Sequence, residues 1–174
     1  IGSGTVVQGR KELKLRVLVV VSLVVLCACS QRPDFFDTDG NGYRYSDIRG
    51  KWQVINYWAT WCAPCIREIP ELISLNESND NVVVFGVNFD APEGEEITRQ
   101  VEKMGITFPV YLEDPGAHLG IEMPEVLPTT VLIDPEGRIA GVMVGPQTEA
   151  SLLSAMGIKE AMGVRETKPG PDPG

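Results

Sequence analysis

Residues 58–65 are Trp58-Ala59-Thr60-Trp61-Cys62-Ala63-Pro64-Cys65, in which two cysteines are separated by two residues. They follow an apolar run, Val54-Ile55-Asn56-Tyr57, that predicts a buried strand, and they precede a helical pattern. We therefore expect Cys62 at a helix N-terminus, where unpaired amides and the helix dipole favour a thiolate over a thiol. A thiolate attacks disulfides, and Cys65 is near enough to resolve the resulting mixed disulfide.

Cysteine pairs with this spacing also occur in zinc sites and in structural disulfides. Zinc needs four ligands, but the other two cysteines, Cys27 and Cys29, lie in a predicted export signal, and His118 is the only histidine. A structural disulfide would close a very small loop here, a geometry better suited to catalysis. The sequence thus favours a redox-active pair, with no metal and no cofactor other than a Cys62–Cys65 disulfide.

The two residues between the cysteines, Ala63 and Pro64, carry no charge. Pro64 stiffens the turn because its φ is fixed and it lacks an N–H. Since no cationic side chain stands between the sulfurs to stabilise the thiolate further, we expect a reduction potential nearer to about −270 mV than to the roughly −120 mV of strong oxidants.

The first 29 residues form a predicted leader with a lipoprotein signal. Basic residues from Arg10 to Arg16 precede an apolar run, Val17 to Leu26, which is shorter than the roughly 20 residues that span a bilayer. Leu26-Cys27-Ala28-Cys29 resembles a bacterial lipobox, which implies cleavage before Cys29 and lipidation of that residue. An uncleaved anchor or a buried core segment are the alternatives. We expect a lipid-anchored protein of the bacterial cell envelope that faces the periplasm or extracytoplasmic space.

Charge and length set further limits. The 174 residues carry a formal net charge of −9, and the basic leader leaves the remainder more acidic still. Nucleic acid would be repelled, so we expect none as a partner. We expect a monomer with a linker at 30–35, a domain at 36–162 and a disordered Pro/Gly-rich tail at 163–174.

Strand and helix patterns alternate after the dithiol. Ile66, Ile69, Leu72 and Ile73 share one face of the first helix. Later elements are predicted at 82–87 (strand), 91–104 (helix), 108–112 (strand), 117–120 (helical turn), 130–134 and 138–144 (strands), and 148–162 (helix). This order predicts an α/β fold, with a mixed sheet and helices on both faces.

Before the first long strand, Asp37-Thr38-Asp39-Gly40-Asn41-Gly42 matches the first half of a calcium-binding loop. The glutamate expected at the twelfth position of such a loop is Ile48. Turn-forming residues between short strands favour a hairpin instead. A hairpin is the preferred interpretation and a calcium loop the alternative.

Three segments together resemble the thioredoxin superfamily, in its extracytoplasmic TlpA/ResA-like branch, which includes thioredoxins of cytochrome c maturation. The segments are Arg49-Gly50-Lys51 with Asn56 to Cys65, then Arg67 to Leu72, then Leu127 to Asp134. The resemblance extends from about residue 36 to 156. It implies a thioredoxin fold with a mixed central sheet, flanking helices, an N-terminal hairpin and a helix-strand insertion at 88–109.

The resemblance also implies catalytic roles. Cys62 would be the attacking thiolate and Cys65 the resolving thiol. Pro128 matches the family's cis-proline, which packs against the dithiol and leaves the preceding backbone, at Leu127, free to pair with a substrate strand. An ordinary trans turn at Pro128 is the alternative.

Proton handling is expected to differ from that of thioredoxins themselves. Asn56 stands where thioredoxins carry a buried aspartate. Glu68 matches a glutamate that lies near the sulfurs in this branch, and we expect it to tune the protonation of Cys65. The alternative is a solvated acid in the first helix.

Residues around the dithiol are expected to contact substrate. These are Trp61, Ala63, Pro64 and Leu127, whereas Trp58 is expected to pack in the core. We assign no catalysis to His118.

The sequence thus predicts an extracytoplasmic thiol-disulfide oxidoreductase. Its substrates would be disulfides of exported proteins, for example in cytochrome c maturation, and a membrane electron donor would reduce it again. Two alternatives remain. One is a thiol peroxidase of the same superfamily, and the other is a Cu(I)-binding metallochaperone or adaptor that uses Cys62 and Cys65 as ligands.

Overall fold

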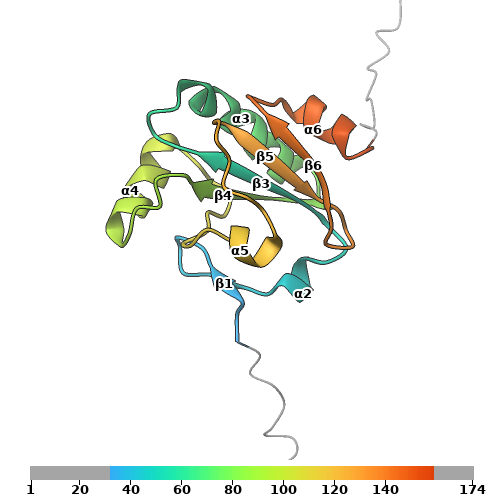
Figure 1. Ribbon diagram of the computed structural model, residues 1–174, viewed down its shortest axis with the longest axis horizontal. Coiled ribbons are helices and arrows are strands. Elements are labelled where there is room, and N and C mark those ends of the chain that lie inside the picture. The colour runs from blue at the N-terminus through green and yellow to red at the C-terminus, as the bar shows by residue number, and fades with distance from the viewer. Residues whose placement is uncertain (1–31, 159–174) are drawn as a thin grey trace, which may run out of the picture. The chain divides into compact units, whose positions relative to one another are not determined.

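The computed structural model describes residues 32–158, drawn as the coloured ribbon in Figure 1. The predicted leader with Cys29 and the predicted tail at 163–174 lie outside these residues. Within residues 32–158, no helix combines the length and the apolar character needed to cross a bilayer.

A mixed four-stranded sheet forms the centre of the domain, in the order β4-β3-β5-β6 (Figure 1). Strand β3 (Trp52–Trp58) runs parallel to β4 (Val82–Asn88). Strand β5 (Thr129–Ile133) is antiparallel to β3 and to β6 (Ile139–Val144). The apolar and β-branched sequences of β3, β4 and β5 are almost entirely buried, as expected where both faces of a sheet are covered. The predicted mixed sheet is confirmed.

Helices cover both faces of this sheet, as predicted. One hydrophobic core lies beneath α3 (Ala63–Ser78), α4 (Glu95–Met104) and α6 (Glu149–Ala155). The second core lies beneath the short helices α2 (Tyr45–Ile48) and α5 (Gly116–Leu119) and the N-terminal hairpin.

Strand β3 contributes side chains to both cores. Val54 and Trp58 belong to the first core, and Ile55 and Tyr57 to the second, because successive side chains of a strand point to opposite faces. The strand that leads into the dithiol is therefore held from both sides.

The predicted N-terminal hairpin is present. Strands β1 (Phe35–Phe36) and β2 (Gly42–Tyr43) pair antiparallel. The buried carboxylate of Asp37 accepts hydrogen bonds from the backbone N–H of Asp39 and Asn41, the Asn41 amide and the Tyr43 hydroxyl, all at 2.8–2.9 Å. Both oxygens of this carboxylate are thus engaged within the hairpin itself.

Two predicted elements differ from the structure. The 108–112 segment is not a strand, because it forms only single bridges, from Val110 to Gly86 and from Tyr111 to Asp37. Pro109 has no N–H to donate, which limits a ladder at this point. The predicted insertion therefore keeps its helix, α4, but not a full strand. The closing helix ends at Ala155 because Gly157 adopts a left-handed φ of 69°.

The predicted apolar face of α3 is correct except at its start. Ile69 and Leu72 are buried, and Ile73 packs against the first core. Ile66 is instead exposed, in the first turn of the helix beside the dithiol.

Candidate active site

The dithiol lies at the start of α3, immediately after β3. A tight turn closes between them, in which the Cys62 N–H donates to the Ala59 carbonyl at 3.1 Å. Cys62 is the N-cap of α3, and its Sγ accepts a hydrogen bond from the Cys65 N–H at 3.2 Å. Pro64 occupies the first helical turn, where a missing N–H costs nothing. The predicted placement of Cys62 at a helix N-terminus is confirmed.

Cys62 and Cys65 form a disulfide, with the two Cα atoms 5.3 Å apart. Both residues are buried, with 3% of Cys62 and 0% of Cys65 exposed. The structure therefore represents the oxidised state. After reduction, a sulfur at the helix N-cap receives N–H dipoles that stabilise a thiolate.

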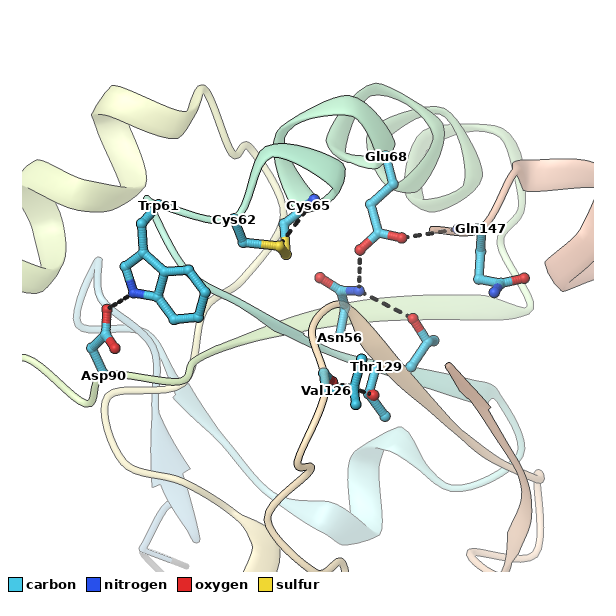
Figure 2. Close-up of a disulfide and its surroundings, with 10 residues drawn as sticks. Asn56, Trp61, Cys62, Cys65, Glu68, Asp90, Val126, Thr129 and Gln147 are labelled. Carbon is cyan, nitrogen blue, oxygen red and sulfur yellow. Dashed lines mark hydrogen bonds between the residues drawn. A yellow bond between two sulfur atoms is a disulfide. The ribbon is translucent and has the colours of Figure 1, made fainter. Parts of the chain in front are cut away.

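The segment before β5 contains the predicted cis-proline. The Leu127–Pro128 peptide bond is cis. Pro128 is buried, and its carbonyl accepts a hydrogen bond from the Gly145 N–H at 2.8 Å. One hydrogen bond spans the cis peptide bond: the Thr129 hydroxyl, which follows Pro128, donates to the carbonyl of Val126, which precedes Leu127, at 2.7 Å (Figure 2). Leu127 is half-buried and contacts both cores.

Glu68 lies one helical turn beyond Cys65 and is 2% exposed. Its Oε1 accepts from the Asn56 side-chain amide at 2.8 Å, and its Oε2 accepts from the Gln147 backbone N–H at 2.9 Å (Figure 2). Burial raises the pKa of Glu68, and the two hydrogen bonds from Gln147 and Asn56 offset only part of that rise. The alternative of a solvated acid is therefore wrong.

Asn56 occupies the centre of the same buried cluster. Its Nδ2 donates to Glu68 and also to the Thr130 hydroxyl, at 3.0 Å. Its Oδ1 is buried and has no hydrogen-bond partner among the described residues.

Trp61 is the most exposed large hydrophobic side chain beside the dithiol, at 64%. Its indole N–H donates to Asp90 at 2.9 Å (Figure 2). Its ring meets that of Phe89 edge-on, with the centroids 6.3 Å apart. Ala63 is exposed and Pro64 half-buried, whereas Trp58 lies in the core as predicted.

An apolar groove of about 550 Å³ adjoins the segment that contains the cis-proline. It reaches Val126 on one side and β6 on the other, and Met123, Val142 and Val144 are among its exposed apolar lining residues. The lining residues from Gly120 to Val126 thus lead directly into the Leu127–Pro128 bond.

The sequence did not reveal all members of the site. Gln147 contributes a backbone N–H, which no side-chain motif can signal, and it lies 79 residues from Glu68. Thr130 lies within the Leu127 to Asp134 segment, but the sequence assigns it no role. Asp90 could have been suspected only as a polar residue that follows a buried strand.

Comparison with known proteins agrees with this geometry. Residues 29–142 match the model of the AhpC/TSA family. The "Thiol-disulfide oxidoreductase ResA" of Geobacillus kaustophilus is 35% identical over 127 residues, which cover 71% of this chain and 72% of the relative. The ResA of Bacillus subtilis is 29% identical over 174 residues, covering 86% and 95%.

Solved structures agree as well. The pneumococcal exposed lipoprotein thioredoxin Etrx1 of Streptococcus pneumoniae is 25% identical and aligns with a TM-score of 0.58, covering 73% of this chain and 98% of that one. With its thioredoxin fold and its Cys62–Cys65 pair at a helix N-terminus, this chain belongs to the AhpC/TSA family and is a thiol-disulfide oxidoreductase of the ResA-like type.

Proposed function

We propose that this enzyme reduces disulfides in exported polypeptides, with Cys62 as the attacking thiolate and Cys65 as the resolving thiol. The observation that supports this assignment best is the position of Cys62 at the N-cap of α3. Cys65 is fully buried one turn later, where an external disulfide has no access to it.

The proposed reaction transfers two electrons to the substrate. The Cys62 thiolate attacks one sulfur of a substrate disulfide, the other substrate sulfur leaves as a thiolate, and a mixed disulfide forms. The Cys65 thiol gives up its proton and attacks the Cys62 sulfur, which releases the second substrate thiolate. The enzyme ends as the Cys62–Cys65 disulfide, and a membrane dithiol donor reduces it again.

Glu68 would accept the proton that Cys65 loses. A carboxylate that is buried and has a raised pKa is a better base than a solvated one. Its position one turn from Cys65 on α3 supports this role.

Substrate would bind beside the disulfide, along the segment that contains the cis-proline. Among the backbone hydrogen bonds of residues 32–158, none involves Leu127, so its N–H and C=O are available to an added strand. Trp61, Ala63 and Pro64 would contact the substrate from the other side, and the exposure of Trp61 and Ala63 supports this assignment.

We further propose that the chain is a lipoprotein anchored through Cys29, with a linker at 30–35, a domain at 36–162 and a disordered tail at 163–174. The lipobox-like Leu26-Cys27-Ala28-Cys29 supports the anchor, as does the similarity to a thioredoxin described as an exposed lipoprotein. Apocytochromes c are among the exported thiol proteins that such a monomeric enzyme would reduce.

Trapping tests this function directly. A Cys65→Ser variant should stall at the mixed disulfide, so mass spectrometry of the captured complexes should identify exported cysteine proteins. The Cys62→Ser variant is the control and should capture none. Failure of Cys65→Ser to capture any partner, together with rapid consumption of peroxide or tight binding of Cu(I) by the reduced wild-type protein, would favour the alternatives instead.

A further inference from the structure

The buried side chain of Asn56 has one end satisfied and one end without a partner. Its Nδ2 donates to Glu68 at 2.8 Å and to the Thr130 hydroxyl at 3.0 Å. These two acceptors fix the orientation of the amide, because a rotated amide would turn its oxygen toward the Glu68 carboxylate. The unpartnered atom is therefore the oxygen, Oδ1.

This oxygen is directed toward the redox-active pair. Figure 2 shows Oδ1 on the side of the amide that faces the Cys62–Cys65 disulfide, away from Glu68 and Gln147. Asn56 and Cys65 are both 0% exposed, so water has no access from outside to this part of the site. A buried carbonyl oxygen without a donor is unfavourable, and native structures rarely keep one without a reason.

The state of Cys65 supplies such a reason. A disulfide sulfur has no hydrogen to donate, whereas a thiol does. Resting on the roles proposed above for Cys62 and Cys65, we propose that Asn56 is a positioning residue whose Oδ1 accepts a hydrogen bond from the Cys65 Sγ–H in the reduced enzyme. The amide then connects the resolving thiol to Glu68, with one end on each group.

Two consequences follow for the enzyme. The hydrogen bond exists only in the dithiol form, so it shifts the dithiol–disulfide equilibrium toward the dithiol. It also holds Cys65 as a thiol in a defined orientation until the mixed disulfide forms. The bond from Asn56 to Glu68 is present in the oxidised structure and needs no change on reduction.

The test compares two leucine variants in the full-length enzyme. Asn56→Leu removes an acceptor that benefits only the reduced form, so we expect its dithiol–disulfide equilibrium constant to fall about tenfold, equivalent to about 30 mV. The hydrogen bond from Asn56 to Glu68 is lost equally from both redox forms, so its loss does not change the equilibrium constant. Equilibration with a glutathione or dithiothreitol buffer gives the potential.

Gln53 offers a matched control. It lies near the opposite end of the same strand, is also buried, and its Oε1 is also without a partner. Gln53→Leu should change the stability of both redox forms alike and shift the equilibrium constant less than twofold. Equal shifts in the two variants, or no shift in Asn56→Leu, would overturn the proposal.

The pH dependence separates this role from a merely structural one. The difference in reduction potential between Asn56→Leu and the wild type should be largest where Cys65 is a thiol. It should shrink once Cys65 ionises and loses its hydrogen. A difference that is constant over this range would count against the hydrogen bond.

A measurement on the wild-type enzyme covers the case in which Asn56→Leu does not fold. The side-chain carbonyl carbon of Asn56 should change its NMR chemical shift on reduction, and that of Gln53 should not. An unchanged Asn56 signal would refute the proposal. If the wild-type disulfide did not equilibrate with thiol buffers at all, the proposed function itself would fail, which is a different outcome.

Discussion

Opposing effects act on a single carboxylate at the centre of the site. Burial disfavours the charged form of Glu68, and hydrogen bonds from Asn56 and from the Gln147 backbone favour it. Burial is the larger effect, so the pKa is raised above its ordinary value of 4.5. Protonation of Glu68 is therefore more favourable in the folded than in the unfolded protein.

Replacing this group should alter how stability depends on pH. With a raised pKa, the folded state binds more protons than the unfolded state, so the stabilisation is complete below pH 4.5 and is lost as pH rises through the folded-state pKa. In Glu68→Gln this loss is absent, and the stability of the variant relative to wild type should increase over that range, by at most about 1.4 kcal/mol per pH unit. Urea unfolding of the oxidised proteins at several pH values measures this.

A control shows whether the effect belongs to burial. Glu77→Gln removes an exposed carboxylate from the same helix, so it reports the effect of losing one negative charge without burial. If Glu68→Gln and Glu77→Gln gave the same profile, the raised pKa would be wrong.

At the scale of elements, the site depends on how closely β3 packs against β4. Trp58, the last residue of β3, lies over Gly86 of β4, and a Cβ at Gly86 would be 2.8 Å from its Nε1 and 3.0 Å from a methyl of Val110. Glycine is needed here for close approach. The turn that holds Cys62 begins directly after Trp58, so the packing of Trp58 on Gly86 helps to hold the dithiol in place.

A methyl group at this position should therefore destabilise the fold. Gly86→Ala is expected to lower the free energy of unfolding by about 1–3 kcal/mol through overpacking. Gly141→Ala in β6, where nothing lies within 4 Å of the added Cβ, is the matched control and should change it by less than about 0.5 kcal/mol. Chemical denaturation distinguishes them, and equal effects would contradict the packing argument.

The N-terminal hairpin leads to a prediction about calcium. The Asp37 carboxylate already accepts four hydrogen bonds from its own loop, and the expected glutamate ligand is Ile48. Adding calcium or a chelator should therefore leave the Tm unchanged, whereas Asp37→Ala should lower it. A calcium-dependent rise in Tm would revive the calcium-loop interpretation.

For the whole molecule, the predicted lipid anchor determines where the enzyme meets its partners. Cys29→Ser should release the protein from the membrane fraction of a bacterial host, because the two acyl chains of the modified cysteine would be missing. Cys27→Ser should leave it membrane-bound, since that residue would be removed with the signal. Intact mass of the extracted protein gives the adduct directly, and an unmodified Cys29 would refute the anchor.

The sequence predicts most of this domain because its signals are local. Apolar runs mark β3 and β4, spacing marks α3 and α4, and two residues between cysteines mark the dithiol. Hydrophobicity alone wrongly predicts a strand at 108–112, because it does not reveal that this segment forms only single bridges next to Pro109. Helical spacing wrongly places Ile66 on the buried face, because it does not show that the first turn of α3 remains exposed beside the dithiol.

The candidate site could be predicted only in part, for a related reason. Cys62, Cys65 and Glu68 lie close together in the sequence at the start of α3, so a single motif includes them. The partners of Glu68 come from β3 and from the segment before α6, which only tertiary folding brings together. The unpartnered oxygen of Asn56 is a property of three elements at once, and no spacing along the chain encodes it.

The burial of both sulfurs has a consequence for selectivity between electron carriers. With 3% of Cys62 and none of Cys65 exposed, a freely diffusing small thiol reaches the sulfurs slowly and needs a long incubation to equilibrate with the pair. On the proposed docking surface beside Trp61 and Leu127, a protein partner would bring its own sulfur to Cys62 and hold it there. Proteins that dock on the domain would therefore set its working redox state faster than the small thiols around it do.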